Sequence, residues 1–228
     1  MLDEPGIHGL LPHGGDRRAR LLVTDDRAHD RLSSVMGGAR AGMVTVCKPA
    51  VQCAALLDGD ATWRAGIATA MICRNLRTVP AAALPRELML RPVRRIAGDA
   101  PQGVGLTEAV AAACRADPQL TDSRALADHL RSLPTAFTLW VAVDHGGMVR
   151  ATSGSAAFGT VATVIFVNTD PGWRRRGIAQ AMTAIALRAA EQTGARQAGL
   201  DASDAGRALY LALGFEAATP VKRFRSSV

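Results

Sequence analysis

The sequence predicts an α/β protein in which helices flank a β-sheet. Val164–Val167 is a continuous run of β-branched and aromatic residues, which is typical of a buried strand. Residues 178–189 then carry apolar side chains on one helical face. Of the 228 residues, 48% are hydrophobic but only 4% are aromatic. This composition favours helices packed closely on a sheet over an aromatic-rich sandwich.

A basic loop joins this strand to this helix. The strand ends at Asn168–Gly172, where proline and glycine indicate a turn. Three arginines follow, Arg174–Arg176, and the helix is expected to end near Gly194, because glycine suits the left-handed position after a helix. The apolar stripe consists of Ile178, Ala181, Met182, Ile185, Ala186 and Ala189.

The loop has the chemistry of an anion site. The first turn of a helix leaves backbone N–H groups unpaired and carries the positive end of the helix dipole, so it attracts phosphate. Gly177 and Ala179 lack bulky side chains, which lets a diphosphate approach the main chain, and Arg174–Arg176 add positive charge.

Two motifs in this part of the chain resemble those of the GNAT N-acetyltransferase superfamily. Residues 174–179, RRRGIA, are similar to the Arg/Gln-x-x-Gly-x-Gly/Ala signature that holds the pyrophosphate of acetyl-CoA. Residues 202–215, ASDAGRALYLALGF, are similar to the later Asn-x-x-Ala-x-x-x-Tyr-x-x-x-Gly-Phe motif. The chain departs from that motif at Ser203, in place of Asn, and at Gly206, in place of Ala.

The resemblance implies the acyl-CoA N-acyltransferase fold, with a mixed, mostly antiparallel sheet flanked by helices. It implies acetyl-CoA as cosubstrate and direct attack by an amine within a ternary complex, with no metal. A backbone N–H of the predicted strand end would stabilise the oxyanion. The residues expected to bind acetyl-CoA are Phe166, Val167, Asn168, Thr169, Arg174, Arg175, Arg176, Gly177, Ile178, Ala179, Ser203, Arg207 and Tyr210.

Two residues are candidates for catalysis. Tyr210 is the only tyrosine, and the resemblance implies that its phenol is the general acid toward the CoA sulfur; a phenol, with a reference pKa of about 10, is protonated at neutral pH. A packing role between helix and sheet is the alternative. For the general base the sequence offers Asp144, His145, Asp170 and Asp201, and Asp201 on a short predicted strand is preferred.

The resemblance covers residues 87–228, predicted to be the acetyltransferase domain. Residues 1–86 are predicted to be a smaller α/β region of unknown role, with a loose arm at residues 1–20 and a proline-bracketed linker at residues 79–86. The strands and helices expected before the linker are residues 21–23, 43–47, 50–57 (helix) and 71–76. Those expected after it are 87–94, the helices 107–114 and 123–130, a hairpin of 137–143 with 148–152, a strand at 198–202, a helix carrying Tyr210, and a strand pair within 215–224.

A short internal echo raises a second hypothesis. Residues 66–71, GIATAM, resemble residues 177–182, GIAQAM, and each follows a Trp-Arg pair. The echo suggests a degenerate half-copy of the acetyltransferase lobe. The residues before Trp63 do not form a β-branched strand, however, which argues against a second cofactor loop.

Charge and cysteine content narrow the function classes. The net charge is +7, but all of the 27 basic residues except Lys48 and Lys222 are arginines dispersed along the chain, which disfavours a nucleic-acid partner. The four cysteines lack metal-binding spacing, and the chain has no signal peptide or membrane-length apolar run, so we expect reduced thiols and a cytoplasmic protein that does not bind membranes.

Three functions stay open from the sequence. The preferred one is acetyl transfer from acetyl-CoA to a primary amine of a small molecule or peptide. The alternatives are a CoA-binding regulatory protein without turnover and a nucleic-acid-binding protein. The sequence leaves the amine acceptor unidentified and a homodimer open.

Overall fold

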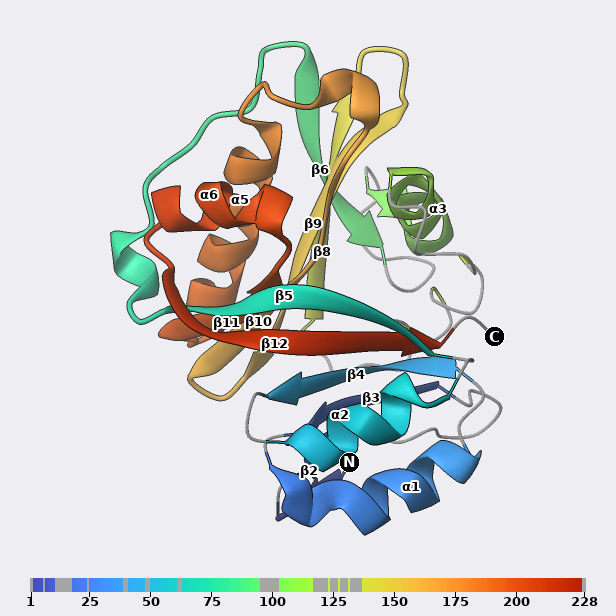
Figure 1. Cartoon of the computed structure of the whole chain (residues 1–228). Helices are drawn as coiled ribbons and strands as arrows, with labels where there is room; N and C mark the ends of the chain where they lie inside the picture. Colours follow the sequence, from blue (N-terminus) through green and yellow to red (C-terminus); the bar gives the residue numbers. More distant parts are fainter. Residues whose placement is uncertain are drawn as a thin grey trace. The chain divides into compact units, whose positions relative to one another are not determined.

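The computed structural model describes residues 2–5, 7–10, 18–23, 25–38, 41–47, 50–60, 63–94, 103–116, 123, 127, 131 and 137–226. Residue contacts divide the chain into two compact units. The first comprises Met1–Met71, Asp201–Arg207 and Ala217–Val228, and the second comprises Ile72–Leu200 and Ala208–Glu216. Figure 1 colours the chain from blue to red along the sequence.

The first unit is built on strands in the order β1-β2-β3-β4-β12-β5. Neighbours up to β12 pair antiparallel, except that β3 and β4 run parallel around helix α1. Such a parallel pair needs a crossover connection, which the helix provides. The bounds are β1 (Leu2–Glu4), β2 (Ile7–Leu10), β3 (Arg18–Val23), η1 (Asp26–Ala28), α1 (His29–Gly38), β4 (Ala41–Cys47), α2 (Val51–Asp58), β5 (Trp63–Cys73) and β12 (Glu216–Ser226).

Helices α1 and α2 contribute to a single core in this unit (Figure 1). Leu32 of α1 and Leu57 of α2 are fully buried and share a cluster with Val44 of β4 and Phe224 of β12. Burial of four such side chains stabilises the unit by roughly 1.5–3 kcal/mol each.

The second unit is built on strands in the order β11-β10-β9-β8-β6-β7. The three central pairs, β10 with β9, β9 with β8 and β8 with β6, are antiparallel, whereas the outer pairs, β11 with β10 and β6 with β7, are parallel. The bounds are η2 (Leu76–Thr78), β6 (Leu88–Arg94), β7 (Val104–Gly105), α3 (Leu106–Ala116), β8 (Phe137–Asp144), β9 (Val149–Phe158), β10 (Val161–Thr169), η3 (Pro171–Trp173), α5 (Ile178–Gln192) and β11 (Gln197–Ala202).

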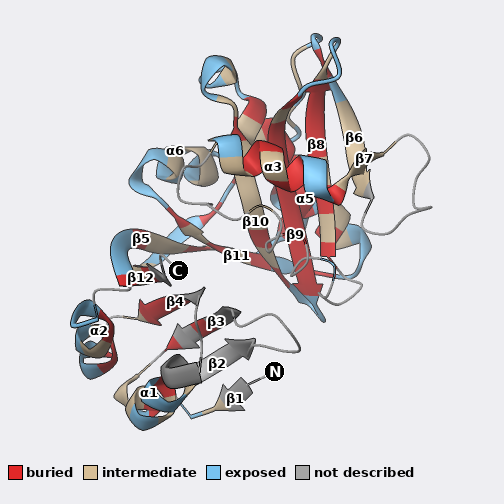
Figure 2. Ribbon diagram, turned by 90° about the vertical axis from the view of Figure 1, so that its right-hand side faces the viewer, coloured by how far each residue is buried: buried red, intermediate tan, exposed pale blue. Residues whose placement is uncertain are grey.

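Helices α3 and α5 cover opposite faces of this sheet (Figure 1). Because side chains alternate along a strand, Val141 of β8 packs in the cluster of α3, while its neighbour Ala142 packs with Met182 of α5. The strands between the two helices are therefore buried on both sides, and Figure 2 shows β8 and β9 coloured as buried along most of their length.

The predicted mixed, mostly antiparallel sheet with flanking helices is confirmed. Helix α5 begins directly after Gly177 and ends before Gly194, both of which have positive φ (+74° and +101°). A helix is also found around Tyr210, α6 (Asp204–Ala212), of which Asp204–Arg207 counts with the first unit.

Several predicted elements differ from the structure. Residues 2–10, expected in a loose arm, contain β1 and β2, because β1 pairs with β2 and β2 pairs with β3. Of the expected strand at 71–76, only residues 71–73 are strand, at the end of the longer β5, and Leu76 begins η2. The expected pair within 215–224 is the single strand β12. The helix expected at 123–130 lies largely outside the described residues.

Residues 79–86, the predicted linker, lie within the second unit. The boundary between domains at residue 86 stays a prediction. The echo at residues 66–71 lies inside strand β5, so it forms no loop at a helix start.

Cys53 and Cys73 are buried thiols, and Cys47 and Cys114 are half-buried ones. Burial, with the nearby carboxylate of Asp26, raises the pKa of the Cys53 thiol to about 11. None of the described helices combines the length and the apolarity needed to cross a membrane.

Candidate functional site

The end of strand β10 departs from regular pairing. Its register with β9 shifts by one residue between Ile165, opposite Gly154, and Asn168, opposite Thr152. On its other edge, β10 pairs with β11 only over Val161–Thr163. Neither ladder gives partners to Phe166 and Val167, so this stretch of main chain can bind a ligand.

A side chain holds this bulge in place. Phe166 has a φ of +54°, which is uncommon for a residue other than glycine and costs roughly 1–2 kcal/mol. The hydroxyl of Thr152, on β9, donates a hydrogen bond to the carbonyl oxygen of Phe166 at 2.7 Å. That bond opposes relaxation of the bulge toward an ordinary strand.

The loop after β10 is shaped by a cap and two left-handed residues. Asp170 precedes η3, and its carboxylate accepts a hydrogen bond from the N–H of Gly172 at 3.0 Å. Arg175 has a φ of +64° and Gly177 of +74°. Gly177 is the N-cap of α5 and provides no side chain for the first turn, whose N–H groups lack helical partners. The loop therefore ends in unpaired amides at the positive end of a helix.

The three arginines of the loop have different surroundings. Arg174 donates from Nε to the carbonyl of Thr169 at 3.1 Å and from Nη2 to the carbonyl of Ala116, at the end of α3, at 2.9 Å. Arg176 lies over the ring of Trp173, 4.9 Å from its centroid. Arg175 is exposed, and no ion pair engages it within the described part of the chain. Only Arg175 and Arg176 can therefore turn toward an anion without breaking a backbone contact.

Two ion pairs of Arg150 connect the loop to strands β8 and β9. Arg150 of β9 contacts Asp144 at 2.7 Å and Asp170 at 3.0 Å, and its guanidinium lies 5.5 Å from the ring centroid of Trp173. The backbone N–H of Met148 and the Arg150 guanidinium hydrogen-bond Asp144 and lower the pKa of its carboxyl. Asp144 and Asp170, two of the four general-base candidates, thus serve to position Arg150 and the loop.

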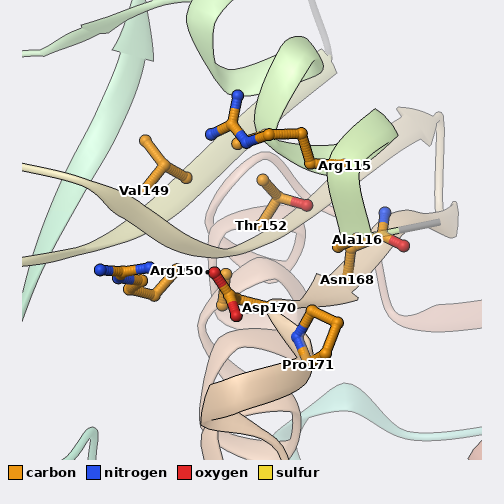
Figure 3. Close-up of a pocket in the computed structure, with 10 residues that line it drawn as sticks. Arg115, Ala116, Val149, Arg150, Thr152, Asn168, Asp170 and Pro171 are labelled. Atoms are coloured by element: carbon orange, nitrogen blue, oxygen red, sulfur yellow. Dashed lines mark hydrogen bonds and ion pairs between the residues drawn. The ribbon is translucent and has the colours of Figure 1, made fainter.

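A hollow of about 90 Å³ lies beside the bulge, between α3 and strands β9 and β10. Ala112, Ala116, Val149 and Ala151 give it apolar walls, and its polar lining consists of Arg115, Arg150, Thr152, Asn168 and Asp170. Figure 3 shows Arg115 extending from α3 and marks the ion pair between Arg150 and Asp170, two further residues of the lining. Of the residues predicted to bind acetyl-CoA, Asn168 lines the hollow.

Tyr210 lies on α6, where its half-buried ring packs edge-to-face with Phe215 at a centroid distance of 5.8 Å. Asp201 belongs to the first unit, as do Ser203 and Arg207. Its carboxylate accepts from the Thr45 hydroxyl at 3.1 Å and lies 3.4 Å from the guanidinium of Arg223. His145 is exposed in the turn between β8 and β9.

Sequence reasoning missed Thr152, Arg150 and Arg115. Thr152 and Arg150 stand two positions apart in an ordinary β-strand pattern, and Arg115 lies in the last turn of an amphipathic helix. Neither pattern marks a site, because their partners are supplied by the tertiary fold. Among the described residues, no three His, Cys, Asp or Glu side chains gather as metal ligands.

Comparisons with known proteins concern the domain type and the fold. Residues 135–217 match the family model of the acetyltransferase (GNAT) domain. A GCN5-related N-acetyltransferase from Kribbella flavida is 18% identical, with a TM-score of 0.61 over 98% of this chain and 87% of that one. A GCN5-related N-acetyltransferase from Sphaerobacter thermophilus is 15% identical, with a TM-score of 0.60 over 96% and 75%.

A GCN5-related N-acetyltransferase-like protein from Streptococcus suis is 15% identical, with a TM-score of 0.57 over 96% of this chain and 82% of that one. At such identities the likeness concerns the fold. No curated protein matches the chain.

Proposed function

We propose that this chain, whose residues 135–217 match the family model of the acetyltransferase (GNAT) domain, is an acetyl-CoA-dependent N-acetyltransferase acting on a primary amine. The observation that carries the proposal is the break in the pairing of β10 directly before a helix start capped by Gly177. One extended ligand with a diphosphate and a thioester arm suits this arrangement of main chain.

The residues fit acetyl-CoA in two places. The unpaired amides of Gly177, Ile178 and Ala179 suit the diphosphate, with Arg175 and Arg176 nearby to neutralise its charge. A Cβ added at Gly177 would meet no atom within 4 Å, so the approach to the main chain is open. The stretch Phe166–Thr169 suits the pantetheine arm, since Phe166 and Val167 lack ladder partners.

The proposed reaction is direct attack. The amine nitrogen forms a bond to the acetyl carbon, the carbon–sulfur bond breaks, the amine loses a proton and the CoA thiolate gains one. A main-chain N–H at the bulge would stabilise the oxyanion, and Thr152 would keep it in place by fixing Phe166. The remaining predicted cofactor contacts, Ser203 and Arg207, rest on the motif resemblance.

Tyr210 is proposed as the general acid toward the sulfur. Replacing Tyr210 with Phe keeps the ring that packs on Phe215 and removes the hydroxyl. We expect kcat to fall about 10²- to 10⁴-fold with unchanged acetyl-CoA affinity. Full turnover in this variant would remove the role.

Asp201 remains the proposed base, although its carboxylate already contacts Thr45 and Arg223. The variant Asp201→Asn separates a role as base from a structural role. If the variant loses activity only at low pH and unfolds at the same midpoint as the wild type, Asp201 is a base. If the variant unfolds at a lower midpoint and keeps the pH profile of the wild type, Asp201 is structural.

The proposal is tested by calorimetric titration of acetyl-CoA and by release of free CoA thiol across a panel of amines. We expect saturable binding and thiol release that depends on an amine. Binding with no release for any amine would instead support a CoA-binding protein without turnover, the alternative predicted from sequence. No binding would overturn the proposal.

A further inference from the structure

The hollow between α3, β9 and β10 borders the place where the thioester would lie. Thr152 and Asn168 line it, and they are the first pair of the β9–β10 ladder after the bulge. A molecule seated in the hollow therefore lies next to Phe166 and Val167, the main chain proposed for the pantetheine arm. This position is that of an acceptor.

The described residues that line the hollow include two arginines and one carboxylate. Asp170 is the only carboxylate among the described residues that line it, and Arg150 pairs with it at 3.0 Å while also contacting Asp144. Arg115 is exposed on the last turn of α3, and no ion pair engages it among the described residues. Figure 3 shows its guanidinium on the α3 side of the hollow. Among the described residues, Arg115 is thus the lining cation that no carboxylate neutralises.

The size and walls of the hollow restrict its occupant further. Its volume is about 90 Å³, well below the roughly 300 Å³ at which pockets for drug-sized ligands begin. Alanine, valine and proline side chains form its apolar part. A short aliphatic chain fits such walls, whereas a second ammonium would be desolvated beside Arg115 and Arg150 without a free carboxylate.

From these observations we propose that the acceptor is a small amino carboxylate, whose amine faces the bulge and whose carboxylate binds Arg115. The inference rests on the proposed function and assigns its substrate class. Arg115 acts as the specificity residue, because a guanidinium binds a carboxylate through two parallel hydrogen bonds. Polyamines and other polycationic amines are disfavoured as acceptors.

The test compares matched amines in the thiol-release assay with acetyl-CoA. The pairs are β-alanine with propylamine and γ-aminobutyrate with butylamine, which differ mainly by the carboxylate, and putrescine represents a diamine. We expect at least one amino acid to exceed its alkylamine in kcat/KM by about tenfold, the worth of one charge-assisted contact. Putrescine should be the poorest acceptor.

Variants assign that preference to Arg115. Arg115→Gln should raise the KM of the preferred amino acid about tenfold while leaving the alkylamine unchanged, and Arg115→Glu should reverse the order in favour of putrescine. Arg188→Gln is the matched control, since Arg188 is an exposed arginine of α5, on the opposite face of the sheet.

The outcomes separate the two proposals. Thiol release that is equal for amino acids and alkylamines, or that is unchanged in the Arg115 variants, overturns the assignment of the acceptor and leaves the acetyltransferase standing. An equal rise of KM in Arg188→Gln also overturns it. Absence of release with every amine overturns the acetyltransferase itself.

Discussion

At Gly177, two substitutions can separate the effect of the backbone angle φ on acetyl-CoA binding from the effect of a negative charge. Its φ of +74° is open to glycine and tolerated by asparagine, and space for a side chain is present. Gly177→Asn should therefore weaken acetyl-CoA binding modestly, whereas Gly177→Asp, with nearly the same shape, adds a negative charge where the diphosphate would bind. We expect the Asp variant to bind acetyl-CoA at least about tenfold more weakly than the Asn variant, because one charge-assisted contact contributes about that factor to affinity. Calorimetry measures both, and equal affinities would contradict a diphosphate at this helix start.

Thr152 carries a second prediction for a single side chain. Thr152→Val keeps the shape but removes the hydrogen bond to the carbonyl of Phe166. Because this hydrogen bond no longer holds the bulge in place, kcat should fall about tenfold with little change in the KM of acetyl-CoA. Thr152→Ser should keep the kcat of the wild type. Thr138→Val is the control, since that hydroxyl on β8 contacts Ser155, not the bulge, within the part of the chain that the structure describes. A similar loss in the control would show that the effect is general destabilisation.

Helix α3 and the loop before α5 are joined by Arg174. Its guanidinium binds carbonyls at both, Ala116 at 2.9 Å and Thr169 at 3.1 Å. Arg174→Ala should lower the free energy of unfolding by about 1–3 kcal/mol and raise the KM of both substrates. Arg175→Ala removes the same charge from an exposed residue and should leave stability unchanged. Urea unfolding compares the two variants, and equal midpoints would refute the link.

The β8–β9 hairpin gives a pH-dependent prediction. The pKa of Asp144 is lowered in the folded protein, chiefly by the N–H of Met148 and then by Arg150. The stabilisation it provides is therefore complete above the unfolded pKa of about 3.9 and is lost as the pH falls through the lower, folded value. Asp144→Asn should lower Tm at pH 7, and the difference from wild type should narrow below about pH 4. A Tm difference that stays constant down to pH 3 would contradict the charge effect.

These elements also show what the sequence could foretell. Local patterns predicted the start and end of α5. The sequence places glycines at 177 and 194, and both have positive φ in the structure. The contacts that complete the site join residues far apart in the chain, such as Arg174 with Ala116, 58 positions away. Nothing in the local composition of α3 indicates that its last turn borders β10. The hollow and the role suggested for Arg115 therefore required the fold.

Across the whole molecule, the net charge of +7 is dispersed and partly paired. Arg27, Arg74, Arg77, Arg150 and Arg223 each form an ion pair with a carboxylate in the described regions. We expect only weak nucleic-acid binding that disappears between 50 and about 200 mM salt, as nonspecific phosphate contacts do. Fluorescence anisotropy with a labelled duplex measures this. Tight binding that persists at the higher salt would revive the nucleic-acid-binding alternative.

The setting of Trp173 has a practical consequence. The guanidinium groups of Arg150 and Arg176 lie 5.5 Å and 4.9 Å from the centroid of its indole ring. Indole emission responds to nearby charge, and an arriving diphosphate would draw Arg176 away from the ring. With Trp63 and Trp140 changed to phenylalanine, the protein would carry a single built-in optical reporter beside the loop. Stopped-flow mixing could then time the arrival of the nucleotide without a label.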